Sequence, residues 1–594
     1  MSKTTLLSPA AVIFKVYPDA FWNSSNAITK VVYIDNADGD TRNRMITHVL
    51  QRLAQHLTRE HDKVELHFQE QQRRRNLQQL QLSTTTSAAD NGEQDFDFSE
   101  IFGDLPLMEE DLDTTIDATQ FPPVRASHIS FILVNEQAKV RTKLYPRTFH
   151  CKYCGHFLAL NPARPPLNLT CPCCRHDQLI QEPIVFGCAR CANVIELFPK
   201  GERSNSTPTN RRTINIDNFL GTPPPCPECS SGHIHLEKHN TNNLVSWQWK
   251  CNSCKQYLEN VQELCLKCYL PKENSDDKTD ITFMSAFPAS ASNALHPLVD
   301  VQMFLKDEPL EPATFPTAAI ESAQNWADYF ELKPLANITN SILDLDKIEV
   351  IENACISNAY LLNRVRVVTT IYGYQAGDIM KHPRSPVQLP DRLARFFRDP
   401  EGLTDYQCFG MINEGSALVI ELDKSKIIER LSQLYPYITT SYNDLLQTER
   451  EELGIIPLRE LLQPISLQHN QFPLISALHA LEHAILINAH RQIGNEVLGS
   501  ILFPQAGVIL LYERESIGRG GVVQLINRGQ GLVKLILAAT DHVNGCAQGC
   551  FDGCPSCSYI NDMYCQYHQE DFNNRWLPPN ILLSRTGGRS ILKS

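Results

Sequence analysis

The sequence predicts an α+β multidomain protein, and three observations lead to this fold class. The chain has 594 residues and 42% apolar content, enough for about three or four domains that each bury a core. Six Cys-x-x-Cys pairs fall between residues 151 and 268, a density typical of small metal-stabilised modules. From residue 345 to 594, strand-like and helix-like segments alternate, as expected for a mixed α/β domain.

The first region, residues 1–145, is predicted to be an α/β region with polar and acidic loops. The segments "AVIFKVY", "KVVYID", "HISFILVN" and "KVRTKLYP" have the composition of strands, and "RNRMITHVLQRLAQHLT" has the apolar spacing of an amphipathic helix. Between them, a glutamine-rich stretch precedes the acidic "DFDFSEIFGDLPLMEEDLD". This composition favours a solvated loop over a docking peptide.

The second region, residues 146–272, is predicted to be a zinc-ribbon region. Two residues between paired cysteines allow one tight turn to aim both sulfurs at one ion, and two pairs close a tetrahedral zinc site. The sequence has no secretory signal and no apolar run of membrane-spanning length, so we expect a reducing cytoplasm, where thiols are not oxidised to disulfides. The predicted ligands are Cys151, Cys154, Cys171, Cys174, Cys188, Cys191, Cys226, Cys229, Cys251, Cys254, Cys265 and Cys268.

The sequence leaves open which pairs share an ion. Joining neighbours along the chain gives Cys151/Cys154 with Cys171/Cys174, Cys188/Cys191 with Cys226/Cys229, and Cys251/Cys254 with Cys265/Cys268. An alternative joins Cys226/Cys229 with Cys251/Cys254, because the intervening segment reads as two ribbon strands. The segment "CPCCRHDQLIQEPIVFGCARC" offers a similar alternative, Cys171/Cys174 with Cys188/Cys191.

Other side chains of this region have less certain roles. Cys173 is predicted to be a spare thiol, whereas His150, His156 or His233 can replace a sulfur at any of the sites. Trp247 and Trp249 alternate along one strand. Indoles can stack on single-stranded bases, but two on one face of a strand are more typical of a small core.

Residues 273–344 are predicted to be a linker followed by a helix over "AAIESAQNWADYFEL". Residues 345–594 then form the predicted C-terminal zinc-binding domain, with strands such as "SALVIEL" and "GVILLYE" and helices such as "ISALHALEHAILINAHRQI". Near its end, four cysteines are spaced +4, +3 and +8, which is sufficient to surround one more ion. These ligands are Cys550, Cys554, Cys557 and Cys565, and they bring the expected content to about four zinc ions.

The segment "HALEH" raises the question of catalysis. His479 and His483 lie four residues apart and Glu482 is adjacent, the order found in inverzincin metallopeptidases. Both histidines flank an apolar helical stripe, and no third ligand is evident, so a zinc-dependent hydrolase is the less favoured alternative. The chain also lacks a phosphate-binding P-loop.

Three C-terminal stretches together resemble a known family. "ISALHALEHAIL", "GVILLYERESIGRGGVVQLI" and "GCFDGCPSCSYINDMYC" are similar to the C-terminal zinc-binding domain shared by MrfA-type repair helicases and by DrmB, a subunit of DISARM phage-defence systems. The upstream strands "LLNRVRVVTTIYGY" and "INEGSALVIELD" also look like DrmB strands, whereas the first 145 residues do not match. The resemblance implies zinc ligation by the four C-terminal cysteines.

The resemblance also implies a non-catalytic scaffold that associates with a separately encoded ATP-dependent helicase and helps it engage DNA in antiphage defence. A protein-only adaptor is the other alternative. Because the formal net charge is −13, DNA binding requires a local basic patch. The candidate contacts are Arg211, Arg212, Lys250, Arg364, Arg366, Arg392, Arg395 and Arg519.

Overall fold

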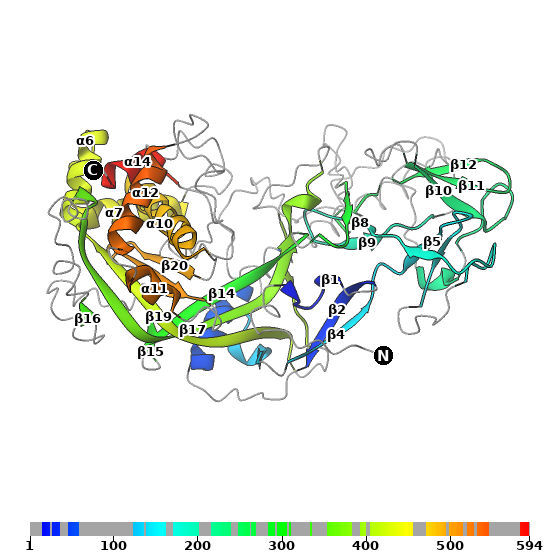
Figure 1. Ribbon diagram of the computed structural model, residues 1–594, viewed down its shortest axis with the longest axis horizontal. Coiled ribbons are helices and arrows are strands. Elements are labelled where there is room, and N and C mark those ends of the chain that lie inside the picture. Colours follow the sequence, from blue (N-terminus) through cyan, green and yellow to red (C-terminus); the bar gives the residue numbers. More distant parts are fainter. Residues whose placement is uncertain are drawn as a thin grey trace, which may run out of the picture. The chain divides into compact units, whose positions relative to one another are not determined.

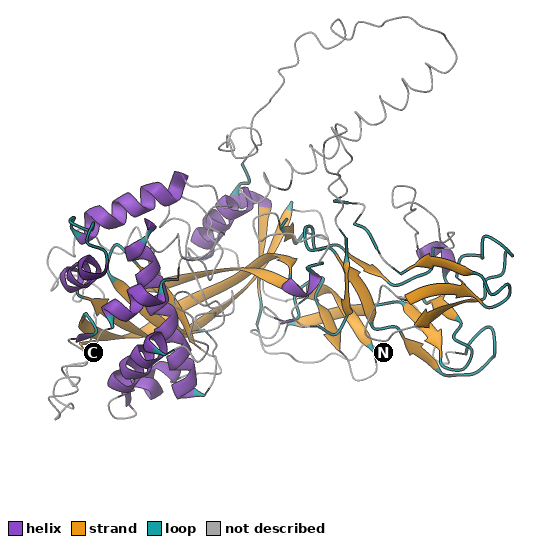
Figure 2. Ribbon diagram, turned by 90° about the horizontal axis from the view of Figure 1, so that it is seen from above, coloured by secondary structure: helices purple, strands orange, loops and turns teal. Residues whose placement is uncertain are grey.

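The computed structural model confirms an α+β multidomain protein, with helices and several separate sheets (Figures 1 and 2). The described residues are 15–23, 27–35, 45–58, 64, 123–135, 138–161, 170–200, 216–221, 223–238, 247–261, 263–265, 267–268, 283–291, 294–305, 308–310, 333–334, 353–382, 392–399, 404–455, 471–494, 498–514, 520–527, 531–545 and 583–592. Within these ranges, no helix is both long and apolar enough to cross a membrane.

The chain divides into two compact units, each made of separate segments. Unit 1 comprises residues 1–40, 50–298 and 371–409, and unit 2 comprises residues 41–49, 299–370 and 410–594. Two of the boundaries fall inside the long strands β17 (Ile356–Ala376) and β19 (Tyr406–Leu422). The compact units are therefore discontinuous, whereas the sequence prediction divides the chain into consecutive regions.

The N-terminal part of unit 1 has a small antiparallel sheet. Its strands are β1 (Phe21–Asn23), β2 (Ile28–Asp35) and β4 (Lys139–Leu144), in the order β1-β2-β4. β2, β4 and the nearby β3 (Ile129–Leu133) confirm three predicted strands, and residues 45–58 confirm the predicted helix. In the predicted strand "AVIFKVY", the described residues 15–17 form no strand. The acidic segment lies outside the described residues.

Unit 1 also contains three further antiparallel sheets, each of three strands. The first has the order β6-β5-β7, with β5 (Thr148–Cys151), β6 (Phe157–Ala159) and β7 (Leu179–Gln181). The second is β13-β8-β9, with β8 (Ile184–Gly187), β9 (Val194–Glu196) and β13 (Ser285–Pro288). The third is β10-β11-β12, with β10 (Ile234–Lys238), β11 (Trp247–Cys251) and β12 (Tyr257–Asn260).

Each of these sheets is too small to bury a core by itself. They share one buried core, and cysteine side chains fill part of that core. One buried cluster contains Cys188, Cys226, Cys251 and Cys265 together with Trp247, Trp249, Phe157 and Leu258. Trp249 meets Phe157 edge to face, with the ring centroids 4.9 Å apart. Both tryptophans therefore belong to the core, as the sequence indicates.

Unit 2 is built on a large sheet whose main path is β15-β14-β17-β19-β21-β20. β14 (Leu295–Leu305), β15 (Glu308–Leu310), β20 (Leu498–Phe503) and β21 (Val508–Glu513) join the long β17 and β19. β13 and β14 occupy part of the predicted linker, whereas the predicted helix within it lies outside the described residues. Side chains alternate between two cores: Leu418 and Ile420 belong to one cluster, and Ala417 and Val419 to the other.

Helices cover one face of this sheet (Figure 1). They are α6 (Lys424–Leu434), α7 (Tyr442–Ile455), α10 (Pro473–Ile493), α11 (Gly521–Asn527), α12 (Gly531–Asn544) and α14 (Arg585–Ile591). α10 is buried on all sides over residues 473–486, as expected for a central helix. Its first turn is capped by Glu449 of α7, which accepts hydrogen bonds from Leu474 N (2.9 Å) and Ile475 N (2.8 Å).

The contact between α14 and α10 generates a stability prediction. A Cβ at Gly587 would lie 2.6 Å from Ala477 Cβ, whereas a Cβ at Gly588 would lie 3.5 Å from Ala480 Cβ. We expect Gly587→Ala to destabilise unit 2 by about 1–3 kcal/mol through overpacking. We expect Gly588→Ala to be neutral or up to about 1 kcal/mol stabilising, because alanine favours helix. Denaturant unfolding of both variants measures the difference, and equal effects would contradict the close approach.

Candidate metal centres

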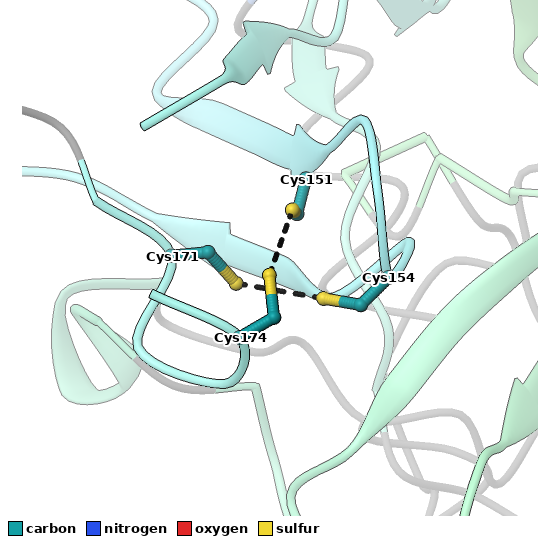
Figure 3. A group of neighbouring side chains, drawn as sticks. All are labelled: Cys151, Cys154, Cys171 and Cys174. Atoms are coloured by element: carbon teal, nitrogen blue, oxygen red, sulfur yellow. Dashed lines mark hydrogen bonds between the residues drawn. The ribbon is translucent and has the colours of Figure 1, made fainter. Parts of the chain in front are cut away.

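The twelve cysteines of the six pairs form three groups of four. The groups are Cys151, Cys154, Cys171 and Cys174 (group 1); Cys188, Cys191, Cys265 and Cys268 (group 2); and Cys226, Cys229, Cys251 and Cys254 (group 3). Within each group, all four sulfurs lie within 4.8 Å of one another. Figure 3 shows group 1, in which two loops direct their sulfurs toward a common centre. Each group can therefore hold a metal ion.

The distances between sulfurs fit a tetrahedral thiolate site. Between the two pairs of a group, Sγ–Sγ distances are 3.4 and 3.5 Å in group 1, 3.8 and 3.6 Å in group 2, and 3.7 and 3.5 Å in group 3. A tetrahedron with zinc–sulfur bonds of about 2.3 Å has edges of about 3.8 Å. A disulfide would require about 2.05 Å. All twelve cysteines are free thiols, so the donor set suits zinc.

The groups decide between the alternative pairings. The neighbour pairing is right for group 1, but it is wrong for Cys188/Cys191 with Cys226/Cys229 and for Cys251/Cys254 with Cys265/Cys268. The alternative ribbon, group 3, is the one observed, and Cys171/Cys174 with Cys188/Cys191 is not. Group 3 is nested in sequence between the two halves of group 2. The reason lies in strand pairing: β13 pairs with β8, and Leu264 forms a bridge with Phe283 just before β13, which places residues 265–268 beside the β8–β9 turn.

Five of the six cysteine pairs share one backbone turn. The first cysteine accepts, through its carbonyl, an N–H from the residue four positions later, as Gly155 N does to Cys151 O at 2.9 Å. That fourth residue has a left-handed φ in every case: Gly155 (67°), Arg175 (61°), Ala192 (52°), Ser230 (59°) and Lys255 (64°). Four of these are not glycine, so the surroundings must offset about 1 kcal/mol or more of strain at each. Metal ligation on both sides of the turn provides such an offset.

The same turn favours ionised sulfur. Burial raises the pKa of Cys151, yet the N–H groups of Cys154 and Tyr153 donate to its sulfur, and the net result is a pKa of about 7. Cys251 behaves in the same way: against burial, the N–H groups of Cys254 and Ser253 hold its pKa at about 7. The pKa values are lowered because hydrogen bonds from backbone N–H groups stabilise the charged thiolate.

Within a group, ionisation of one thiol disfavours ionisation of the next. In group 2, hydrogen bonds from Cys188 and Cys265 place the pKa of Cys191 well below its usual range. The pKa values of Cys265 and Cys268 are raised, first by their hydrogen bonds with Cys188 and Cys191. Four negative sulfurs cannot coexist at these distances without a compensating charge. A divalent cation bound between the sulfurs would supply this charge. The chemistry of the sulfur donors therefore fits a metal ion in all three groups.

The groups differ in burial. All four cysteines of group 2 are buried, and Cys188 and Cys268 are fully enclosed. In groups 1 and 3, Cys154, Cys174 and Cys254 are partly exposed and Cys229 is exposed. Group 2 thus lies in the core of unit 1, whereas the turns of groups 1 and 3 reach the surface.

Arg395, a predicted nucleic-acid contact, supports the turn that carries Cys191 of group 2. Its Nε donates to Cys191 O at 2.8 Å, and its Nη2 donates to Asn193 Oδ1 at 3.3 Å. Its neighbour Arg392 is 2% exposed and donates to Ala376 O at 2.7 Å. Both guanidinium groups are thus bonded within the protein, and their contact with nucleic acid stays a prediction. No pattern in the sequence places residues 392–395 beside a cysteine pair 200 positions earlier.

Of the other nucleic-acid candidates, two have described side chains, and both of these form ion pairs. Lys250 lies 2.9 Å from Glu237 and over the ring of Tyr257, and Arg366 lies 2.8 Å from Glu414. Both are already ion-paired. Arg211, Arg212 and Arg519 lie outside the described residues, as does the side chain of Arg364.

No histidine belongs to any of the three groups. His150 faces the buried Glu182, with Nδ1 3.3 Å from its carboxylate. His156 and His233 contact each other, ring centroids 5.7 Å apart, and the Cys173 sulfur lies 3.8 Å from His233 Nδ1. Cys173 remains outside the groups, as the sequence predicts.

A cavity of about 380 Å3 adjoins group 2. Its lining includes Arg147, which bonds to Glu196 and Asp217, and Lys200, whose Nζ lies 2.5 Å from Glu263. Arg147 and Lys200 are thus each paired with an acidic side chain.

The His-x-x-Glu-His segment lies deep in unit 2. His479, Glu482 and His483 are at most 1% exposed, and the two imidazoles pack edge to face with centroids 4.4 Å apart. Among the described residues, no third metal-binding side chain joins them. The segment therefore packs within a central helix. The predicted C-terminal ligands, Cys550, Cys554, Cys557 and Cys565, lie outside the described residues.

No protein-family model matches the chain, and no curated protein matches its sequence. What can be said of function therefore depends on the sites themselves.

Removal of one group 2 ligand tests the metal centre. Because Cys191 is buried and is one of only four sulfur ligands that the group can offer, we expect Cys191→Ser to lose one equivalent of zinc and to expose unit 1 to proteolysis. Cys173→Ser is the matched control and should keep the wild-type zinc content. Elemental analysis with limited proteolysis measures both, and equal zinc in the two variants would contradict the site.

The supporting role of Arg395 can be tested separately. Its two hydrogen bonds orient the turn that carries Cys191, and such outer contacts affect metal affinity by about 10- to 100-fold. We expect Arg395→Ala to release one zinc ion at least about tenfold faster to a chromogenic chelator. Arg398→Ala, an exposed change three residues away, should match the wild type.

Proposed function

We propose that the protein is a non-catalytic, zinc-binding scaffold subunit that associates with a separately encoded ATP-dependent helicase in the cytoplasm and helps it engage DNA, in antiphage defence. The observation that carries this proposal is the set of three four-cysteine groups in ribbon-like sheets. Ribbons of this kind stabilise short segments and present their turns to nucleic acid or protein. The fourth site, at the C-terminal cysteines, is part of the proposal.

Two further observations support an accessory role over hydrolysis. The only sequence motif that suggests catalysis, on α10, is enclosed on all sides, so no substrate can reach its carboxylate without unfolding of the helix layer. Groups 1 and 3 are four-sulfur sets, and closed sets of this kind are structural because they leave no coordination position for water. The absence of an open coordination position in these four-sulfur groups supports the scaffold role. The helicase and defence context follow from the resemblance of the C-terminal stretches.

Binding of nucleic acid and helicase by the purified full chain tests the proposal. We expect the protein to co-elute with its partner helicase after nuclease treatment, and to bind DNA with an affinity that falls as salt rises. A contact that neutralises about three phosphates of a single strand loses roughly tenfold to twentyfold in affinity between about 50 and 200 mM salt. Gel filtration and fluorescence anisotropy provide the measurements.

The outcomes separate the candidate functions. Capture of the helicase without any DNA affinity would favour a protein-only adaptor. Hydrolytic activity that is lost in Glu482→Gln with the fold intact would favour the hydrolase. Absence of both DNA and helicase binding would overturn the proposal.

A further inference from the structure

An exposed aromatic pair lies on the turns of group 1. The ring of Tyr153 stacks on that of His176, with centroids 4.1 Å apart and planes inclined by 27°. Tyr153 remains 58% exposed, one of the highest values among the large apolar side chains described. It lies between Cys151 and Cys154, and His176 follows Cys174 by two positions. The four-sulfur group thus fixes both turns and holds the stack in place.

This tyrosine is unusual among the six cysteine pairs. The residues between the paired cysteines elsewhere are Pro172 and Cys173, Ala189 and Arg190, Pro227 and Glu228, Asn252 and Ser253, and Leu266 and Lys267. None of these is aromatic. Since the turn itself does not require a tyrosine, the ring serves something other than the shared backbone geometry.

The charges beside the stack are mostly positive. Lys152 precedes Tyr153, Arg175 precedes His176, and both are exposed. Within the described residues, neither side chain has an ion-pair partner. Asp177 is the one acidic residue beside them in these two turns. The chain as a whole carries −13, so this surface differs in sign from the average of the protein.

We propose that Lys152, Tyr153, Arg175 and His176 form a binding surface for single-stranded nucleic acid. An unpaired base would stack on the exposed tyrosine, and the two cations would contact the adjacent phosphates. Aromatic side chains next to cations are the usual means of holding single strands, whereas a duplex keeps its base faces covered. This inference rests on the proposed function and specifies where the strand would bind.

The test compares full-length variants for binding of a labelled oligothymidylate. Stacking contributes about 1–3 kcal/mol per base, so Tyr153→Ala should weaken binding roughly 5- to 150-fold, and Tyr153→Phe should retain most of the affinity. Tyr437→Ala is the matched control, because Tyr437 is also 58% exposed and contacts the ring of Tyr435 at a tilt of 51°, but belongs to unit 2. Zinc content should be unchanged in all three variants.

The phosphate contacts proposed for Lys152 and Arg175 are tested by the salt dependence of the binding affinity. The double variant Lys152→Ala/Arg175→Ala should lower the slope of log affinity against log salt by about 1.4, since each single-strand phosphate contact contributes about 0.7. A duplex of the same length should bind the wild type more weakly and should be insensitive to Tyr153→Ala.

Each outcome is decisive. If the wild type binds single strands and Tyr153→Ala binds equally well, this surface is overturned and the proposed function stands. If Tyr153→Ala weakens helicase capture alone, the surface is a protein contact and the inference is wrong. If the wild type binds neither single strand nor duplex, both this inference and the DNA-binding part of the proposed function are overturned.

Discussion

The architecture of unit 1 depends on compensating the charge of clustered thiolates. The four sulfurs of group 2 lie within 4.8 Å of one another in the core, where burial disfavours any uncompensated charge. A bound cation converts this repulsion into a crosslink. The surrounding sheets have only three strands each, so a bound metal ion and a few aromatic side chains would supply the stability that a large apolar core gives elsewhere.

The nested order of the cysteine pairs has consequences for how unit 1 assembles. Group 1 and group 3 join residues at most 28 positions apart, whereas group 2 joins residues 74 and 80 positions apart. Closure of the longer loop has the larger entropic cost, although this cost grows slowly with length. We therefore infer that groups 1 and 3 form as local modules, and that group 2 closes once β8 and β13 have paired.

The two units use different physical means to reach stability. Unit 2 depends on apolar packing around a helix enclosed on every side, and its polar termini are satisfied by a carboxylate from α7 and a glycine at residue 494. The histidines and glutamate of that helix belong to this packed interior. Unit 1 exposes turns of the four-cysteine groups, whose backbone a bound metal ion would hold in place. A rigid, exposed turn can contact a partner without losing order, which is suited to a scaffold.

The sequence by itself determined the six cysteine pairs that form the candidate metal groups, the strands beside them, the fold class and the core position of the two tryptophans, because these depend on spacing over a few residues. It did not determine which cysteine pairs share an ion, since five of the six pairs form the same turn and differ only in long-range strand pairing. The supporting role of Arg395 and the burial of the His-x-x-Glu-His segment were likewise decided by the tertiary structure. Each arises from contacts between residues far apart in the chain, and local periodicity carries no record of such contacts.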